Sequence, residues 1–184
     1  MKRQDERNGD TLEGQILSSV LKLTEKEVDY IYTRTRDELR FAMKELDLSG
    51  KRYLHLSCHG NKTSLALTLD TLSFASFSDD VSSHLKNRRI FISACEAVND
   101  SLANALFTQN PGCYSLIGPR QVINFDKAAL VWASFYHLTF EIDRDAMKHS
   151  DIGSVMDKVC KTFGVKFNYY RRIKKSPGFS KFSY

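Results

Sequence analysis

Two short stretches of the chain end on side chains that can perform acyl-transfer chemistry. An apolar run over residues 89–93 leads to Cys95, and an alternating run over 51–57 leads to His59. The thiolate is the nucleophilic form of cysteine, and a free thiol with a pKa of about 8.5 is mostly protonated at neutral pH, so it needs a base beside it. An imidazole with a pKa of about 6.5 meets that need and can afterwards protonate a leaving amine. These residues predict a His59–Cys95 catalytic dyad.

A glycine follows the histidine and fits the same chemistry. Gly60 would let a substrate carbonyl approach the backbone, and its N–H, with that of Cys95, could hold an oxyanion. Such a reaction requires only substrate and water, so we expect no cofactor. We also predict no metal site, because no Cys-x-x-Cys or His-x-x-x-His spacing is present. Cys58 should point to the opposite face of its strand from His59 and is interpreted as structural.

The dyad depends on two neighbouring parallel strands, because loops that leave the carboxyl ends of such strands line a common crevice. Thr35-x-x-Glu38 predicts the start of a helix that runs to Leu46 and ends at Gly50, just before the strand leading to His59. Residues 27–33 alternate like a strand, although a second capping box at 24–27 is also compatible with a long helix. We favour the strand, which gives a β-α-β unit with a right-handed crossover.

The remaining elements follow from hydrophobic spacing. We predict helices over 11–23, 73–87, 98–107, 125–140 and 152–163, and strands or hairpins over 65–69 and 113–118. This alternation is typical of a doubly wound α/β fold with a mostly parallel sheet flanked by helices. With 184 residues and 42% hydrophobic content, the chain has room for one substantial domain, which we place at 11–165.

A strand followed by His59-Gly60, and then a strand followed by Ser93-Ala94-Cys95, resembles the caspase-like (clan CD) cysteine peptidases, and among them most closely the bacterial CHAT domain proteases. Further segments fit the same order: 101–106 is similar to the helix after the nucleophile, 113–118 to the next strand, and 125–138 to a long helix. The resemblance covers roughly Val28 to Phe163. It implies a caspase-like three-layer sandwich and a thiol protease activity.

The sequence differs from the caspase pattern in two respects. Glu96-Ala97-Val98 stand where caspases have Arg-Gly or Gln-Gly after the nucleophile, and the histidine lies closer to the cysteine. The resemblance therefore reaches CHAT proteases without implying aspartate specificity. It further implies a protein substrate, a separate activator or sensor protein, and a role in bacterial defence or regulated proteolysis.

Four charged residues are candidates for a substrate pocket. Glu96 and Asp100, just past the nucleophile, could receive a basic P1 side chain. Arg34 and Arg120, each after a predicted strand, could instead grip an acidic one, because guanidinium groups bind carboxylates bidentately. The default interpretation of each is solvated surface or helix capping.

The two ends of the chain differ from its body. Residues 1–10 are charged throughout and predict a flexible arm. Residues 166–184 form a basic aromatic tail that could suit nucleic acid or an acidic partner, although one short cluster neutralises only a few phosphates and such tails are more often solvated ends. There is no apolar leader or membrane-length run, and the four cysteines lack disulfide-scaffold spacing. We therefore expect a cytoplasmic protein with reduced thiols.

Two other functions are alternatives to the peptidase. The fold could be kept as a catalytically silent interaction module, a scaffold or adaptor that docks a partner through the basic tail. A nucleotide-binding Rossmann-type domain lacks support, because neither Gly-x-Gly-x-x-Gly nor Gly-x-x-x-x-Gly-Lys occurs.

Overall fold

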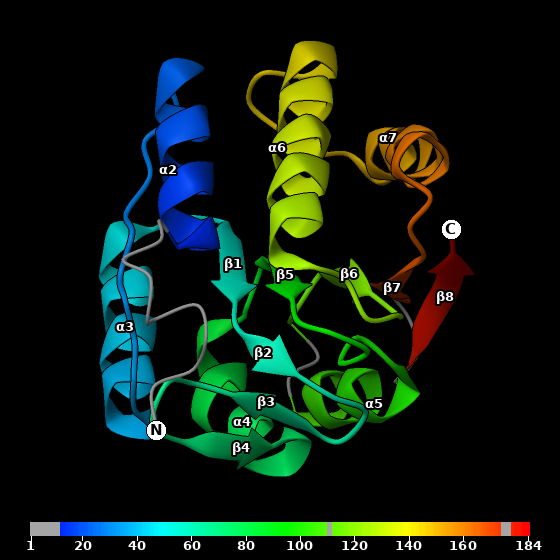
Figure 1. Ribbon diagram of the computed structural model, residues 1–184. Coiled ribbons are helices and arrows are strands. Elements are labelled where there is room, and N and C mark those ends of the chain that lie inside the picture. The colour runs from blue at the N-terminus through cyan, green and yellow to red at the C-terminus, as the bar shows by residue number, and fades with distance from the viewer. Residues whose placement is uncertain (1–11, 110–111, 174–177) are drawn as a thin grey trace. The chain divides into compact units, whose positions relative to one another are not determined.

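The computed structural model describes residues 12–109, 112–173 and 178–184, which divide into two compact units (Figure 1). The sheet unit consists of Ile31–Val122 with Lys166–Ser183, and the helical unit consists of the described residues up to Tyr30 with Ile123–Val165 and Tyr184. All candidate catalytic and pocket residues belong to the sheet unit. The predicted arm at 1–10 lies outside the described residues.

A five-stranded sheet with the order β1-β5-β6-β7-β8 organises the sheet unit. Strands β1 (Tyr53–Ser57), β5 (Arg89–Ser93) and β6 (Ser115–Pro119) are parallel to one another. Strands β7 (Phe167–Arg172) and β8 (Phe179–Ser183) then continue the sheet in antiparallel pairing. The predicted α/β class is confirmed. The sheet itself is mixed, so the expectation of a mostly parallel sheet holds only for its first three strands.

The segment that the sequence analysis assigns to a tail, 166–184, supplies β7 and β8. Tyr169 and Tyr170 are both fully buried, although alternate residues of β7 face opposite sides of the sheet. A domain boundary at 165 would therefore cut the sheet. The aromatic residues of this segment are core residues of the sheet.

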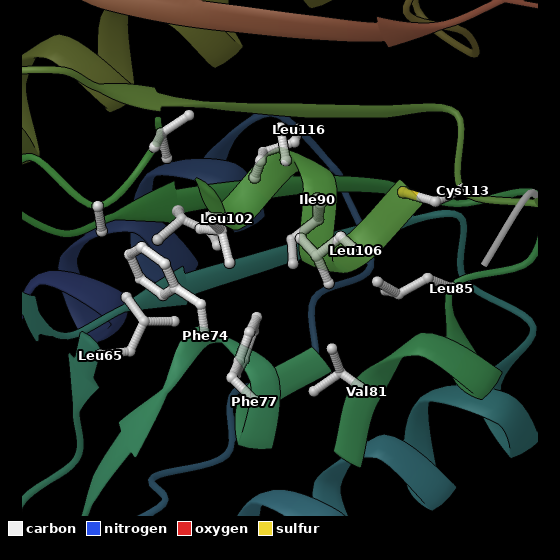
Figure 2. Close-up of a cluster of buried hydrophobic side chains, with 14 of the residues drawn as sticks. Leu65, Phe74, Phe77, Val81, Leu85, Ile90, Leu102, Leu106, Cys113 and Leu116 are labelled. Atoms are coloured by element: carbon white, nitrogen blue, oxygen red, sulfur yellow. The ribbon is translucent and has the colours of Figure 1, made fainter. Parts of the chain in front are cut away.

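One face of the sheet is packed by α3 (Arg36–Ser49), α4 (Phe74–Val81) and α5 (Asp100–Gln109), with a short 3-10 turn, η1 (Ser82–His84), after α4. Alternate strand residues such as Ile90, Ile92 and Leu116 point to this face and meet Phe77 and Leu106 from the helices (Figure 2). Fully burying a side chain of this size contributes about 1.5–3 kcal/mol, so this cluster holds α4 and α5 against the sheet.

The caps predicted for α3 are confirmed. The Thr35 hydroxyl accepts a hydrogen bond from Glu38 N, and the Glu38 carboxylate accepts one from Thr35 N. Gly50 ends the helix with a φ of +65°, a left-handed conformation that glycine adopts without a Cβ penalty. The capping box and the glycine together set the chain's entry into β1.

A second, three-stranded antiparallel sheet follows β1. It consists of β2 (His59–Gly60), β3 (Ser64–Ala66) and β4 (Thr71–Ser73), in that order. The hairpin predicted at 65–69 is thus realised by β3 and β4, and the preceding pair, β2 and β3, carries the candidate histidine. Leu65 and Leu72 anchor this small sheet in the core cluster.

The strand predicted over 27–33 is wrong. Residues 26–34 form neither helix nor strand, and Tyr30, Ile31 and Tyr32 are exposed. Alternation of apolar residues predicts a strand only where a partner strand is available for a backbone ladder. Here β1 is the first strand of its sheet, and these residues connect the helical unit to α3.

The helical unit consists of α2 (Glu13–Leu23), α6 (Phe125–Ile142) and α7 (His149–Phe163). α6 contacts both α2 and α7 and carries a row of stacked rings at Trp132, Tyr136 and Phe140. As predicted, the last helix ends at Gly164, which has a φ of +61°. Of the helices within the described residues, none combines the length and the apolar composition that crossing a lipid bilayer requires.

Candidate active site

The register of β1 and β5 brings the two candidate catalytic residues, His59 and Cys95, to the same edge of the sheet. The strands pair in parallel up to Ser57 and Ser93, and the ladder continues with a 3.1 Å hydrogen bond from Cys58 N to Ser93 O. His59 and Cys95 each follow two residues after this pair. Because adjacent strands lie about 4.8 Å apart, the backbones that carry the imidazole and the thiol leave the sheet side by side.

Gly60 brings the His59 strand into direct contact with the loop that carries Cys95. A Cβ placed on Gly60 would lie 2.9 Å from the Cβ of Ala94 and 3.2 Å from that of Ala97. Real Cβ atoms essentially never approach to the first of these distances, and the second is tighter than most, so a larger residue at position 60 would push β2 away from the loop that carries Cys95. The glycine after the histidine is therefore required for this approach of the backbone, whatever its role in catalysis.

The turn after Gly60 is attached to the same loop by its polar groups. The Asn99 side-chain amide donates to Lys62 O at 3.0 Å and to Glu96 O at 3.1 Å, and Lys62 Nζ lies 3.5 Å from the Glu96 carboxylate. Because the Lys62 side chain is 76% exposed, its ion pair contributes little. The Asn99 amide is the more important of the two links, since it joins the backbones of the two loops.

The hairpin geometry also orients the Gly60 N–H. Asn61 N donates to Ser64 O at 3.0 Å, which makes Asn61 and Ser64 a hydrogen-bonded pair of the antiparallel ladder. Hydrogen-bonded and non-hydrogen-bonded pairs alternate, so Gly60, opposite Leu65, occupies a non-hydrogen-bonded position. Its N–H therefore points away from β3. This direction is compatible with the predicted oxyanion role.

The residue after Cys95 has an unusual backbone. Glu96 has a φ of +56°, a left-handed conformation that costs a non-glycine residue on the order of 1 kcal/mol. Its N–H is held by Gln121 O at 3.2 Å, in the chain that follows β6. The loop then ends where the Asn99 side chain accepts hydrogen bonds from Ser101 N and Leu102 N at the start of α5. The loop over residues 94–99, here called the nucleophile loop because it carries the candidate nucleophile Cys95, is thus a tight turn fixed at both ends.

A polar network from the C-terminal strands supports this loop, and sequence reasoning missed it. The buried Asn168 amide donates to Val98 O at 2.8 Å and accepts from the Ser183 hydroxyl at 3.0 Å. The Tyr170 hydroxyl donates to the Asp100 carboxylate at 2.7 Å, and Lys181 Nζ reaches the same oxygen at 2.8 Å. A polar Asn in an otherwise buried aromatic strand was the available signal, and its meaning depended on knowing that β7 joins the sheet.

These contacts also set the protonation of the network. Hydrogen bonds from Lys181 and Tyr170 hold the pKa of Asp100 below its usual value. Burial, together with the hydrogen bond to Asp100, raises the pKa of Tyr170. Tyr170 therefore remains a hydrogen-bond donor and Asp100 remains an acceptor throughout the neutral pH range.

The four pocket candidates differ in where they lie. The Arg34 guanidinium pairs with Glu38 at 2.7 Å at the start of α3, and the strand that was to place Arg34 at the sheet edge does not exist. Asp100 is held by Tyr170 and Lys181, and Glu96 faces Lys62. Arg120 follows β6 directly, at the same sheet edge as Cys95, and its side chain is exposed.

The four cysteines are free thiols with different access to solvent. Cys113 and Cys160 are buried, and burial raises the pKa of Cys113 to about 12. Cys58 is half-buried and packs against the core cluster, as expected for a structural residue, whereas Cys95 is half-buried at the sheet edge. Within the part of the chain that the structure describes, no group of three or more His, Cys, Asp or Glu could hold a metal ion.

Comparison with known proteins gives no relative to which this geometry could be referred: no family model matches the chain, and no curated protein does.

Proposed function

We propose that this protein is a cysteine endopeptidase in which His59 and Cys95 form the catalytic dyad. The observation that carries the proposal is the paired register of β1 and β5, with Gly60 packed against both sides of the Cys95 turn. Catalytic groups must be held in a fixed mutual position, and the two paired strands and the glycine contact support a dyad at this edge. A caspase-like sandwich and control by a partner protein belong to the same proposal.

The chemistry would proceed in two steps. His59 removes the proton from the Cys95 thiol, and the thiolate adds to the scissile carbonyl carbon. The resulting oxyanion accepts hydrogen bonds from the N–H groups of Gly60 and Cys95. Collapse breaks the C–N bond, and His59 returns its proton to the leaving amine. Water, deprotonated by His59, then hydrolyses the thioester and regenerates the thiol.

The candidate pocket favours an acidic P1 side chain. Glu96 and Asp100 each face a lysine, which reduces their attraction for a basic substrate group. Among the described residues no carboxylate lies within ion-pairing distance of Arg120, which is exposed at the edge. A guanidinium in this position can grip a carboxylate with two parallel hydrogen bonds.

Covalent labelling tests the proposal. The purified chain is treated with peptidyl acyloxymethyl ketones carrying Asp, Arg or Asn at P1, and the modified residue is located by mass spectrometry. We expect labelling at Cys95, preferentially by the Asp probe, and its loss in Cys95→Ala and His59→Ala. Cys58→Ala serves as the matched control, because it removes the neighbouring half-buried thiol and should leave labelling unchanged.

The pocket is tested separately with the same probes. Arg120→Gln should slow labelling by the Asp probe about tenfold or more, since a charge-assisted hydrogen bond contributes about 1.5–3 kcal/mol, and should leave the Asn probe unaffected. If Cys95 labelling is equally fast in His59→Ala, the dyad is wrong. If neither the purified chain nor the chain in cell lysate is labelled, the silent interaction module becomes the better interpretation.

A further inference from the structure

We propose that α6 is the contact surface of a homodimer, in which α6 of one copy packs antiparallel against α6 of a second copy. The proposal concerns the helical unit alone and does not depend on the candidate dyad. Its basis is a row of residues here called the α6 stripe, which consists of Lys127, Leu130, Ser134, Leu138 and Glu141. This row is chemically complementary to itself when the direction of the helix is reversed.

The α6 stripe forms one face of the helix. Its members are spaced by three or four residues, which places them within roughly 80° of one another around an α-helix. The opposite face of α6 is buried, and the helix contacts α2 and α7, between which it lies in Figure 1. The stripe therefore faces away from the other helices of its unit and is open to a partner.

The centre of the stripe is apolar, unlike the exposed surface of a neighbouring helix. Leu130 is 59% exposed and Leu138 is 37% exposed, with the half-buried Ser134 between them. Asp126 and His137, which are exposed at the border of the stripe, are polar, as the rim of an interface usually is. On α7, by contrast, every exposed residue is polar, namely Ser150, Ser154, Asp157, Lys158, Lys161 and Thr162.

Reversing the helix about Ser134 gives every other member of the stripe a suitable partner. When a two-fold axis passes through the interface at Ser134, residues equally far before and after that position meet each other. Leu130 lies four positions before Ser134 and Leu138 four positions after it, so leucine meets leucine. Lys127 lies seven positions before and Glu141 seven positions after, so lysine meets glutamate at both ends of the contact.

The charges of the stripe identify a second copy as the occupant. The ion pairs within the helical unit are formed by other residues, so among the described residues neither Lys127 nor Glu141 has a salt-bridge partner. A second copy pairs both charges twice, whereas an apolar helix of another protein would leave them unmatched. Exposed ion pairs contribute little affinity, and their role here is to set the direction and register of the two helices.

Ser134 fits the position where the two helices cross. Packed helices have axes about 8–10 Å apart, and the shorter separations require small side chains at the contact. Only one helix from each copy takes part, so the interface belongs to the small class that associates weakly and reversibly. We therefore expect a dimer that dissociates on dilution.

Sedimentation velocity of the full chain tests the proposal. Between about 10 and 500 μM, a range suited to a small interface, the protein should pass from monomer to dimer. Leu130→Ser/Leu138→Ser should weaken association at least about tenfold, because four leucines leave the interface. Leu48→Ser/Leu69→Ser is the matched control: it removes two exposed leucines from the sheet unit and should change association less than about twofold.

Exchanging the charges tests the register. Lys127→Glu alone and Glu141→Lys alone each place like charges opposite one another and should weaken association about fivefold or more. Lys127→Glu/Glu141→Lys should restore it, and the two single variants should associate with each other more tightly than either does with itself. Both substitutions suit the helix dipole, and Lys158→Glu on α7 controls for net charge.

Cross-linking locates the axis. Ser134→Cys should form an intermolecular disulfide under copper–phenanthroline oxidation in air, because the two copies of this residue meet at the axis. Ser154→Cys, at an exposed position of α7, should not. Non-reducing electrophoresis measures both, and the unsubstituted chain controls for the native thiols.

Three outcomes would overturn the proposal: a chain that remains monomeric at the highest concentration, a dimer that the leucine variant leaves unchanged, and a double charge variant that associates no more tightly than the single ones. Thermal melts of each variant establish that the comparison is made between folded proteins.

Discussion

The two ends of the parallel strands are built in contrasting ways. At their carboxyl ends, a Cβ added at Gly60 or at Gly118 would lie too close to neighbouring atoms, and the Asn99 amide joins the Gly60 hairpin to the loop that carries Cys95. At their amino ends, Lys86, Tyr114 and Arg171 are exposed to solvent. Bond-making chemistry requires groups held within fractions of an ångström, whereas exposed side chains make few packing contacts. The comparison predicts that substitutions at the first edge affect stability and geometry, and that those at the second have little effect on either.

The largest contrast is expected between two glycines. A Cβ on Gly118, in β6, would lie 2.2 Å from Ile92 O and 2.5 Å from a methyl of Val98, whereas a Cβ on Gly178, before β8, meets nothing within 4 Å. Gly118→Ala should lower the free energy of unfolding by about 3 kcal/mol, because backbone cannot move aside cheaply. Gly178→Ala should change it by less than about 0.5 kcal/mol. Urea denaturation measures both, and equal effects would refute the contrast.

A smaller contrast concerns the polar support of the nucleophile loop. Asn168→Ala should destabilise by about 2 kcal/mol, because the buried Val98 carbonyl loses its donor. The same variant should slow Cys95 labelling, while Arg172→Gln, at the other end of the same strand, should change neither property measurably. If Asn168→Ala lowers stability without changing the labelling rate of the folded protein, this network supports the fold only.

The dependence of stability on acid pH should also differ between residues at the two ends of the strands. The folded-state pKa of Asp100 is lowered by Lys181 and Tyr170, so its contribution is present above the unfolded pKa of about 3.9 and is lost as pH falls below it. Asp100→Asn should therefore flatten the fall in Tm between about pH 4 and pH 2.5. Arginines do not titrate in this range, so Arg171→Gln/Arg172→Gln should leave the slope of the wild-type curve unchanged. If the Tm of Asp100→Asn falls as steeply as that of the wild type over this pH range, the ionised Asp100 does not stabilise the fold through Lys181 and Tyr170.

The smallest effect is expected at two left-handed residues, one on each edge. Glu96 has a φ of +56° and Asn87 a φ of +60°. Asparagine tolerates this conformation better than glutamate does, so Glu96→Gly should be more favourable than Asn87→Gly by about 0.5 kcal/mol. The difference is read from paired denaturation midpoints. The reverse order would show that the Lys62–Glu96 contact outweighs the backbone strain.

Local sequence signals predicted most of the elements but not the way in which the sheet continues. The Thr35 capping box, Gly50 and the helical spacing of Phe74 and Phe77 each act within a few residues, so they can be read directly. Residues 27–33 were expected to form a strand and do not, whereas residues 166–184 were expected to form a tail and instead supply two strands of the sheet. Alternation alone does not say whether a partner strand exists, and strand pairing is a long-range contact.

The sequence by itself determined the identity of the candidate site: a histidine and a cysteine that each follow a strand, with glycine after the histidine. Only the tertiary structure decided that Gly60 packs against Ala94 and Ala97, that Asn168 supports the loop from β7, and that Arg171 lies in line with Arg89. The physical reason is the range of the forces concerned. Capping and propensity act between neighbours in sequence, whereas register and close packing join residues far apart in the chain, and nothing in a local pattern records them.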